Sequence, residues 1–371
     1  MIYTQLKLEN LSKLIAIGLV ICSSPVNAAI VLQKISVVTG VEYESNPTFT
    51  SSNQRSVLRA TALPTYTASL VDEKNRWFTT AGLSVQRSSD SAVSESRQDP
   101  NLVVGWEHEY DKGTFNISAD YSKTSSRLNE FSTNGVIDQD GSATTKSISA
   151  SWSRSLTERL NLSAAGQYSQ INYARSGFSN YKSKSLNSSL TYEWNERINT
   201  FAQIGISELN SEINSTQSRF SKSLLMGTTA MLSPTLNMSA NAGINHRQGS
   251  GAGLVANLSM SYLAERYNLQ GSLSRNVTPS GIGEFQQTNN LNVRYVYELS
   301  EISRVGADFA MSSNGSTAGN NTLQLGGWYA KELSDSLQFR INLNRKQLSN
   351  ASQSASSNII GISLNYNTPN F

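Results

Sequence analysis

The chain has 371 residues, a formal net charge of +3, and only 38% hydrophobic and 15% charged residues. Serine and asparagine contribute 61 and 36 residues, whereas proline contributes 7. A helical enzyme of this size carries more charge and more helix-forming residues, and a disordered chain carries more charge or proline with fewer aromatic side chains. The composition excludes both classes and favours a large all-β protein.

The first 28 residues have the features of a secretory signal peptide. Lys7 and Lys13 precede a short apolar stretch, and Val26-Asn27-Ala28 is a small-x-small cleavage pattern that puts Ala29 at the mature N-terminus. In the alternative reading Cys22 is a lipidated N-terminus, but the bulky Ile21 stands where a small residue is expected. Cys22 is the only cysteine, so residues 29–371, predicted to be a single domain, have no thiol.

After residue 30, apolar and polar residues alternate with a period of two, which predicts half-buried β-strands. We count about 18 such segments, with 16 as the alternative. In chain order the predicted strands cover residues 35–43, 58–68, 77–85, 102–110, 115–121, 148–152, 160–168, 186–194, 200–206, 224–230, 236–244, 254–262, 267–273, 291–297, 305–311, 323–329, 337–343 and 360–366.

The connections between these segments alternate between short and long. Short turns such as Asp72–Asn75 and Asp111–Gly113 alternate with longer segments rich in Ser, Asn and Gly. The longer segments include 46–55, 88–100, 125–143, 276–287, 312–321 and 347–357. Short turns at one rim and long loops at the other are typical of outer-membrane barrels, whose short turns face the periplasm. We therefore predict an all-β, transmembrane, antiparallel up-and-down β-barrel in the Gram-negative outer membrane.

Aromatic residues on the apolar rows come just before the short turns. In the folded barrel they would form one aromatic girdle at a membrane interface, because indole and phenol rings are apolar with one polar tip. A soluble β-sandwich is the alternative, but its core aromatic residues would be scattered along the strands. The predicted girdle consists of Trp106, Trp152, Trp194, Tyr262, Tyr297 and Tyr329.

The rows opposite the apolar ones are rich in Ser, Asn and Gln and are predicted to face the lumen. A barrel of 16 to 18 strands is wide enough to hold water, and this lining offers donors and acceptors with little net charge. Any large barrel needs a hydrophilic lining, so the lining alone does not specify a sugar. Charges in these rows would form a constriction if they converge, or structural pairs if they meet. The candidates are Arg59, Asp120, Arg154, Glu193, Arg247, Arg294, Asp308 and Arg340.

The longest predicted loop, 125–143, carries Glu130, Asp138 and Asp140. It would either fold inward as a plug or stay at the surface, and we favour the surface. Catalytic chemistry is not expected, because His108 and His246 are the only imidazoles and each stands alone on the chain. We predict no enzyme activity, no metal site and no cofactor. Without a concentrated basic stripe we also expect no nucleic-acid partner.

The opening strand carries a family resemblance. Gly40-Val41-Glu42-Tyr43-Glu44-Ser45-Asn46 matches a G-x-x-Y-x-S/D-N pattern, and Leu63-Pro64 puts a proline inside the second strand. In both respects the chain resembles the β-barrel porin 2 group, whose members are similar to outer-membrane proteins of exopolysaccharide and capsule export. The terminal Phe371 also suits such barrels, although Pro369 is expected to bend the last strand.

The resemblance implies a channel that exports a surface polysaccharide, with outer-membrane lipid, the polysaccharide and periplasmic export machinery as partners. Two alternatives stay open. One is a general or oligosaccharide-uptake porin, and the other is a structural or adhesin barrel with a closed lumen.

Overall fold

The computed structural model describes residues 29–131, 140–174, 177–213, 218–314, 320–350 and 354–369. The predicted signal peptide, Asp138 and Phe371 lie outside them. The strands are β1 (Ile30–Glu44), β2 (Val57–Val71), β3 (Asn75–Ser88), β4 (Arg97–Tyr110), β5 (Gly113–Ser125), β6 (Ser142–Ser155), β7 (Leu160–Tyr173), β8 (Tyr181–Asn195), β9 (Ile198–Ser211), β10 (Arg219–Ser233), β11 (Leu236–Arg247), β12 (Gly251–Leu263), β13 (Tyr267–Pro279), β14 (Phe285–Ser300), β15 (Ser303–Asn314), β16 (Asn321–Ser334), β17 (Leu337–Ser349) and β18 (Ser354–Asn367). One helix, α2 (Ser126–Phe131), follows β5.

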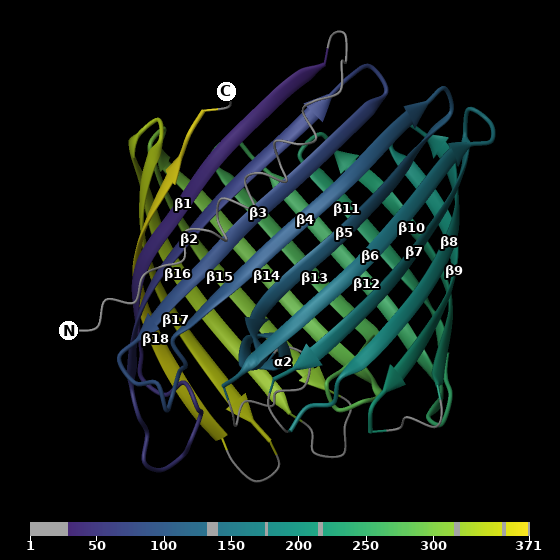
Figure 1. Ribbon diagram of the computed structural model, residues 1–371. Coiled ribbons are helices and arrows are strands. Elements are labelled where there is room, and N and C mark those ends of the chain that lie inside the picture. The colour runs from purple at the N-terminus through teal and green to yellow at the C-terminus, as the bar shows by residue number, and fades with distance from the viewer. Residues whose placement is uncertain are drawn as a thin grey trace.

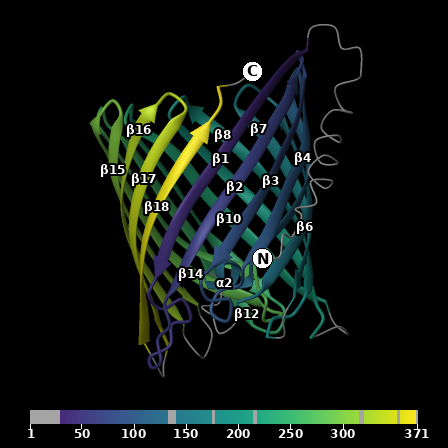
Figure 2. The ribbon, with the colours of Figure 1, turned by 60° about the vertical axis from the view of Figure 1, so that its left-hand side comes forward.

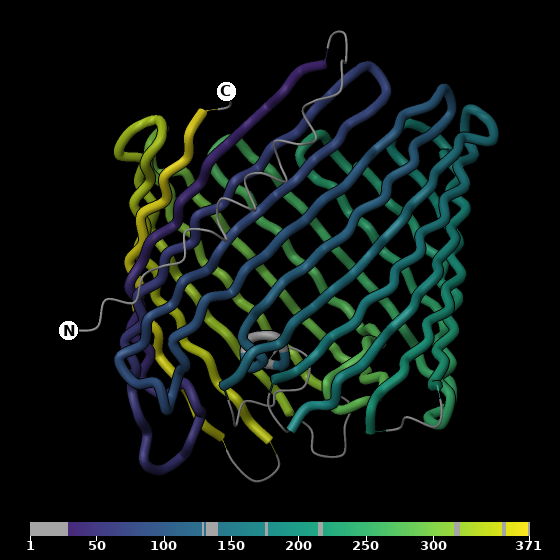
Figure 3. The backbone as a smooth tube through the Cα atoms, viewed as in Figure 1, coloured from purple at the N-terminus to yellow at the C-terminus, as the bar shows by residue number. Residues whose placement is uncertain are grey.

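The strands form a closed antiparallel barrel, which confirms the predicted fold class and strand number. Each strand pairs with its neighbours in sequence, and β1 also pairs with β18 (Figures 1 and 3). Closure leaves no free sheet edge along the paired length, so the backbone hydrogen bonds are satisfied within the wall, as a lipid environment demands. Among the described residues no helix is long and apolar enough to cross a membrane.

The two rims of the barrel differ as predicted. Short turns close one rim, the upper one in Figure 1, and the longer connections lie at the other rim together with α2. The long rim is more ordered than expected, because the predicted loop 276–287 is largely an extension of β13 and β14 that leaves only 280–284 as a turn. Beyond the membrane, polar Ser and Asn residues still form strands because ladder hydrogen bonds do not depend on an apolar row.

The first and last strands close the barrel at a seam. Residues Ser36–Glu44 of β1 pair with Asn367–Ile359 of β18. A Cβ at Gly40 would approach the Ile362 carbonyl oxygen to 2.9 Å, so the glycine permits the close strand contact. At the outer end, Asn46 is fully buried, its side chain donates to the carbonyls of Thr50 (2.9 Å) and Ser356 (3.2 Å), and its oxygen accepts from Thr50 N–H. The residues of the opening motif therefore lie where the two ends of the barrel wall meet.

Candidate functional site

The outer surface and the lumen are distinguished by strict alternation along each strand. Large apolar side chains such as Leu186, Ile204 and Met226 are exposed on one face of the wall, the face directed toward lipid. On the opposite face, polar side chains pair across strands: Ser118 with Ser149 at 2.8 Å, and Asn257 with Asn241 at 2.9 Å. Such pairs partly satisfy one another and add hydrogen-bonding groups to the lumen wall without adding fixed charge.

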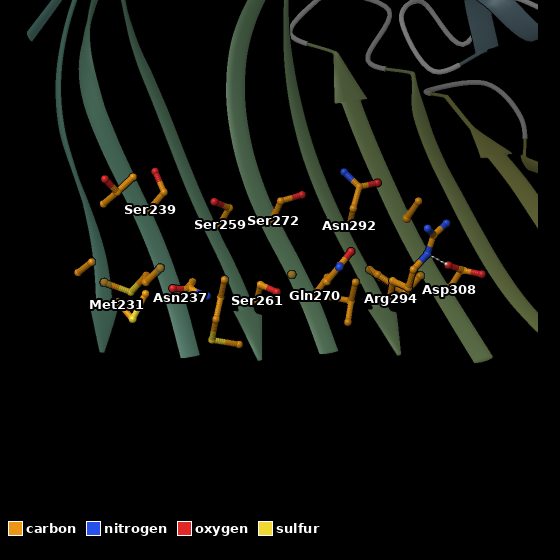
Figure 4. A pocket seen from close by; sticks show the side chains of 18 of the residues that line it. Met231, Asn237, Ser239, Ser259, Ser261, Gln270, Ser272, Asn292, Arg294 and Asp308 are labelled. Atoms are coloured by element: carbon orange, nitrogen blue, oxygen red, sulfur yellow. Dashed lines mark hydrogen bonds and ion pairs between the residues drawn. The ribbon is translucent and has the colours of Figure 1, made fainter. Parts of the chain in front are cut away.

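A cavity of about 870 Å³ lies against the inner wall between β9 and β17. The side chains that project into it in Figure 4 are mostly neutral and polar, and they come from adjacent strands. Its volume falls within the usual range of small-molecule sites, roughly 300–1,000 Å³. The neutral polar part of the lining includes Asn237, Ser239, Ser259, Ser261, Gln270, Ser272 and Asn292.

Three of the predicted lumen charges meet at one edge of this cavity. Arg294 Nε donates to Asp308 Oδ1 at 2.7 Å, and the indole Nε1 of Trp328 donates to Asp308 Oδ2 at 3.1 Å. The Arg340 guanidinium lies 4.3 Å from the Trp328 ring centroid, a cation–π geometry. Four neighbouring strands, β14 to β17, thus supply one connected cluster of two cations, one carboxylate and one indole, which we call the Asp308 cluster.

Trp328 is the member of the Asp308 cluster that the sequence reasoning missed. It stands on the polar row of β16, and its ring lies so close to Gly306 that a Cβ there would overlap the indole. The alternation along β16 was the available signal. The outward residues of β16 are odd-numbered, and Tyr329, which follows Trp328, faces lipid. A tryptophan at an even position therefore had to point into the lumen.

A second charged layer lies at the outer mouth. Arg59 forms ion pairs with Glu42 (2.6 Å) and with Glu44, and Glu44 also accepts from the Ser357 hydroxyl. Asp140 accepts from Glu95 N–H and from the Ser125 hydroxyl, both at 2.9 Å. Here the cations are neutralised by carboxylates, so the layer is a structural network rather than a bare ring of charge.

The mouth is narrowed by α2, which belongs to the predicted loop 125–143; we had favoured a surface position for this loop, whose residues 132–139 lie outside the described residues. In both views α2 lies inside the barrel, enclosed by the strands (Figures 1 and 2). Arg127 donates to the Val93 carbonyl oxygen (3.1 Å) on one side, and on the other the Tyr173 hydroxyl donates to Glu130, whose side chain is fully buried. These contacts hold the helix between the β3–β4 connection and β7.

The tip of the β13–β14 hairpin also reaches the mouth. Ser179 N–H donates to the Gly281 carbonyl oxygen at 2.7 Å, although β8 and β13 are far apart in the wall. Phe285 packs there with Tyr173, Tyr181 and Leu209 in an apolar cluster. The outer mouth is therefore lined by folded segments that approach from different sides of the barrel.

The remaining predicted lumen charges belong neither to the Asp308 cluster nor to the charged layer at the outer mouth. Asp120 stands in the lumen row of β5, Glu193 is exposed near the short-turn rim, and Arg247 lies at the outer end of β11. The prediction for Arg154 was wrong. Arg154 continues the lipid-facing row of Trp152 and is paired with Leu162, so it points outward at the short-turn rim, where a charge reaches water.

The predicted girdle residues lie near the ends of their strands at the short-turn rim. Trp106 stacks on Trp77, with ring centroids 5.4 Å apart. Tyr192 packs edge-on against Trp194, and the Trp194 indole donates to Thr200 at 2.9 Å. Tyr262 contacts Tyr267, which is paired with Tyr297, while Trp152 and Tyr329 lie on the outward rows of β6 and β16.

The His108 ring stacks on Trp106 on the outer surface, and among the described residues no group of three or more His, Cys, Asp or Glu could hold a metal ion.

Comparison with known proteins supports the fold alone. No protein-family model matches the chain, and no curated protein matches it. Among solved structures, the chain is similar to Acinetobacter baumannii OccAB4 (10% identity, TM-score 0.55, covering 92% of this chain and 98% of that chain). It is also similar to Pseudomonas aeruginosa OpdQ (9%, 0.51, 93% and 100%) and to the ferric enterobactin receptor PfeA of the same organism (8%, 0.53, 93% and 82%). With its closed wall and lipid-facing apolar rows, the chain is an 18-strand barrel of the Gram-negative outer-membrane type.

Proposed function

We propose that the protein is an outer-membrane channel that admits small, neutral, hydroxyl-rich solutes such as oligosaccharides. The observation that carries this proposal is the cavity of about 870 Å³, whose polar lining is formed mainly by Ser, Asn and Gln. Such a wall exchanges hydrogen bonds with hydroxyl groups at little net cost, because each bond to the wall replaces one to water. A strongly ion-selective pore would instead present rings of like charge.

Export of a polysaccharide is the second candidate, and the same lining favours it, because a polymer of sugars carries the same hydroxyl groups. The narrowed outer mouth argues for the smaller solute. A polymer must pass α2 and the β13–β14 tip in an extended form, and the anchors Arg127–Val93 and Tyr173–Glu130 hold α2 inside the wall.

Reconstitution distinguishes the candidates. Liposomes that contain the purified barrel should swell in isotonic neutral mono- to trisaccharides, at rates that fall with solute size. Swelling equal to that of protein-free liposomes, together with negligible single-channel conductance, would contradict uptake and leave a closed structural barrel. Loss of extracellular polysaccharide on gene deletion would favour export.

A further inference from the structure

The outer surface carries a cationic patch near the long-loop rim. Lys146, Lys182, Lys184 and Lys222 are exposed on the lipid-facing rows of β6, β8 and β10. The register brings them together, because Lys146 and Lys182 flank Gln170, while Lys184 and Lys222 flank β9. In sequence these residues are scattered, so no basic cluster is visible before folding.

The patch lies at the boundary between lipid and water. Trp194, at the opposite interface, follows Lys184 by ten residues on the same outward row of β8. At about 3.3 Å per residue and a tilt of about 40°, this separation spans a height of about 25 Å, the usual height of the apolar band. The lysines therefore lie at the headgroup level of the outer leaflet.

The lysines are only partly neutralised by protein groups. Glu208 accepts from Lys184 Nζ at 3.1 Å and from Asn210 at 3.1 Å. In the part of the chain that the structure describes, Lys146, Lys182 and Lys222 form no ion pair. The four lysines outnumber the carboxylates beside them on the outward side of β9, Glu208 and Glu212, so the patch has a net positive field toward the headgroups.

A groove beside the patch joins charge to apolar surface. It has a volume of about 390 Å³ and is lined by Ile206, Phe220, Lys222, His246 and Gln248. Ile206 and Phe220 are 40% and 39% exposed, which suits contact with an acyl chain, while Lys222 and His246 stand beside them as donors for an anion.

The opposite end of the same surface has few cations. On the outward rows near the short-turn rim, Arg154 and Lys331 are the cations of β6 and β16, and they stand apart on the wall. Cations of the outward rows are thus clustered at the outer-leaflet side, whereas other cations of the opposite rim, such as Lys74, Lys112 and Arg159, lie in the short turns.

We propose that this patch and groove bind a phosphate-bearing lipid of the outer leaflet, with its phosphates on Lys182 and Lys222 and an acyl chain along Ile206 and Phe220. Phosphate oxygens accept strong charge-assisted bonds from ammonium groups. The binding holds this sector of the wall against the outer leaflet, independently of what passes through the lumen.

The test uses the complete folded barrel in detergent micelles and native mass spectrometry, with diphosphorylated lipid A and its dephosphorylated form as probes. Wild type should bind the phosphorylated lipid preferentially. Lys182→Gln/Lys222→Gln should weaken that binding roughly tenfold or more, given the attraction of each cation for anionic headgroups. The matched control Arg154→Gln/Lys331→Gln removes the same charge from the other rim and should leave binding unchanged.

Two further arms separate the sources of phosphate. Raising ammonium acetate to 0.5 M should weaken binding of the phosphorylated lipid to wild type, since the exposed contacts are screened. Millimolar inorganic phosphate should compete poorly, because it lacks an acyl chain. Equal binding of the two lipids, equal losses in the two double variants, or full displacement by inorganic phosphate would overturn the proposal.

Discussion

At the scale of single residues, the lumen wall depends on close packing between an aromatic ring and a glycine. The Trp328 indole occupies the space where a side chain at Gly306 would lie, and this position lets Nε1 reach Asp308. Gly271 differs, because a Cβ there meets nothing within 4 Å. The two glycines stand in the same barrel wall and so form a matched pair for substitution.

We expect Gly306→Ala to lower the free energy of unfolding by about 1–3 kcal/mol, because the indole must move and the bond to Asp308 is strained or lost. Gly271→Ala should change it by less than about 0.5 kcal/mol. Urea unfolding of the barrel in lipid vesicles measures both. Equal effects of the two substitutions would mean that the ring adapts freely.

Asp308 is the only carboxylate in the Asp308 cluster. It accepts hydrogen bonds from Arg294 and Trp328, and the Arg340 guanidinium lies over the Trp328 ring. We expect Asp308→Asn to shift the channel toward anion selectivity, because both cations then act on the lumen uncompensated. The reversal potential in a KCl gradient measures the shift. The double variant Asp308→Asn/Arg294→Gln should return close to wild type, and a double variant that shifts as far as Asp308→Asn would contradict the pairing.

At the scale of elements, α2 is held in the mouth by contacts from hairpins that are distant in sequence. The bond from Tyr173 to the buried Glu130 is one of them. We expect Tyr173→Phe to leave a buried carboxylate short of a donor, at a cost of about 1–3 kcal/mol, and so to loosen the helix. Single-channel conductance should rise. Tyr168→Phe, on the lipid-facing row of the same strand, is the control and should conduct like wild type.

Asp140 makes the same segment sensitive to acid. Burial tends to raise the pKa of Asp140, but hydrogen bonds from Glu95 N–H and Ser125, with the charges of Arg127 and Arg97, lower it overall. Its contribution to the folded mouth is therefore complete above its ordinary value of 3.8 and is lost as the pH falls below it.

The conductance of the wild-type channel should therefore rise in acid. The conductance of the Asp140→Asn variant should already be high at pH 7 and should not show this acid-induced rise, which we call the acid step. An acid step of unchanged size in Asp140→Asn would assign the effect to another carboxylate.

The strands could be predicted from sequence because period-two alternation is a local signal that survives without its partners. The inward position of α2 could not be predicted from sequence, because the Tyr173 hydroxyl reaches Glu130 only when β7 lies beside the helix. Arg154 was predicted to face the lumen because it is charged, although the alternation along β6 places it on the lipid-facing row of Trp152. An outward charge is tolerated there because the side chain lies at the membrane interface. The lysine patch could not be predicted from sequence either, because only the register between neighbouring strands brings these lysines together.

At the scale of the whole molecule, the barrel depends on one seam that joins the ends of the chain. Gly40 permits close approach of β18, Glu44 accepts from Ser357, and Asn46 ties the outer loop to the Ser356 carbonyl. Seventeen of the strand pairings join neighbours in sequence, whereas the β1–β18 pairing joins distant segments and pays the largest loop-closure entropy. The residues of the opening motif, Gly40–Asn46, therefore have a structural role in closing the wall.

We expect Asn46→Ala to lower barrel stability by about 1–3 kcal/mol, because Asn46 is fully buried and its loss leaves the Thr50 and Ser356 carbonyls without their donor. Since the seam is the junction between the two ends of the wall, the loss should appear as a lower temperature at which the compact electrophoretic form converts to the unfolded one. Asn161→Ala removes an exposed asparagine from the lumen row of β7, away from the seam, and should leave that temperature unchanged. If Asn46→Ala also left it unchanged, the pairing of β1 with β18 alone would suffice to close the barrel.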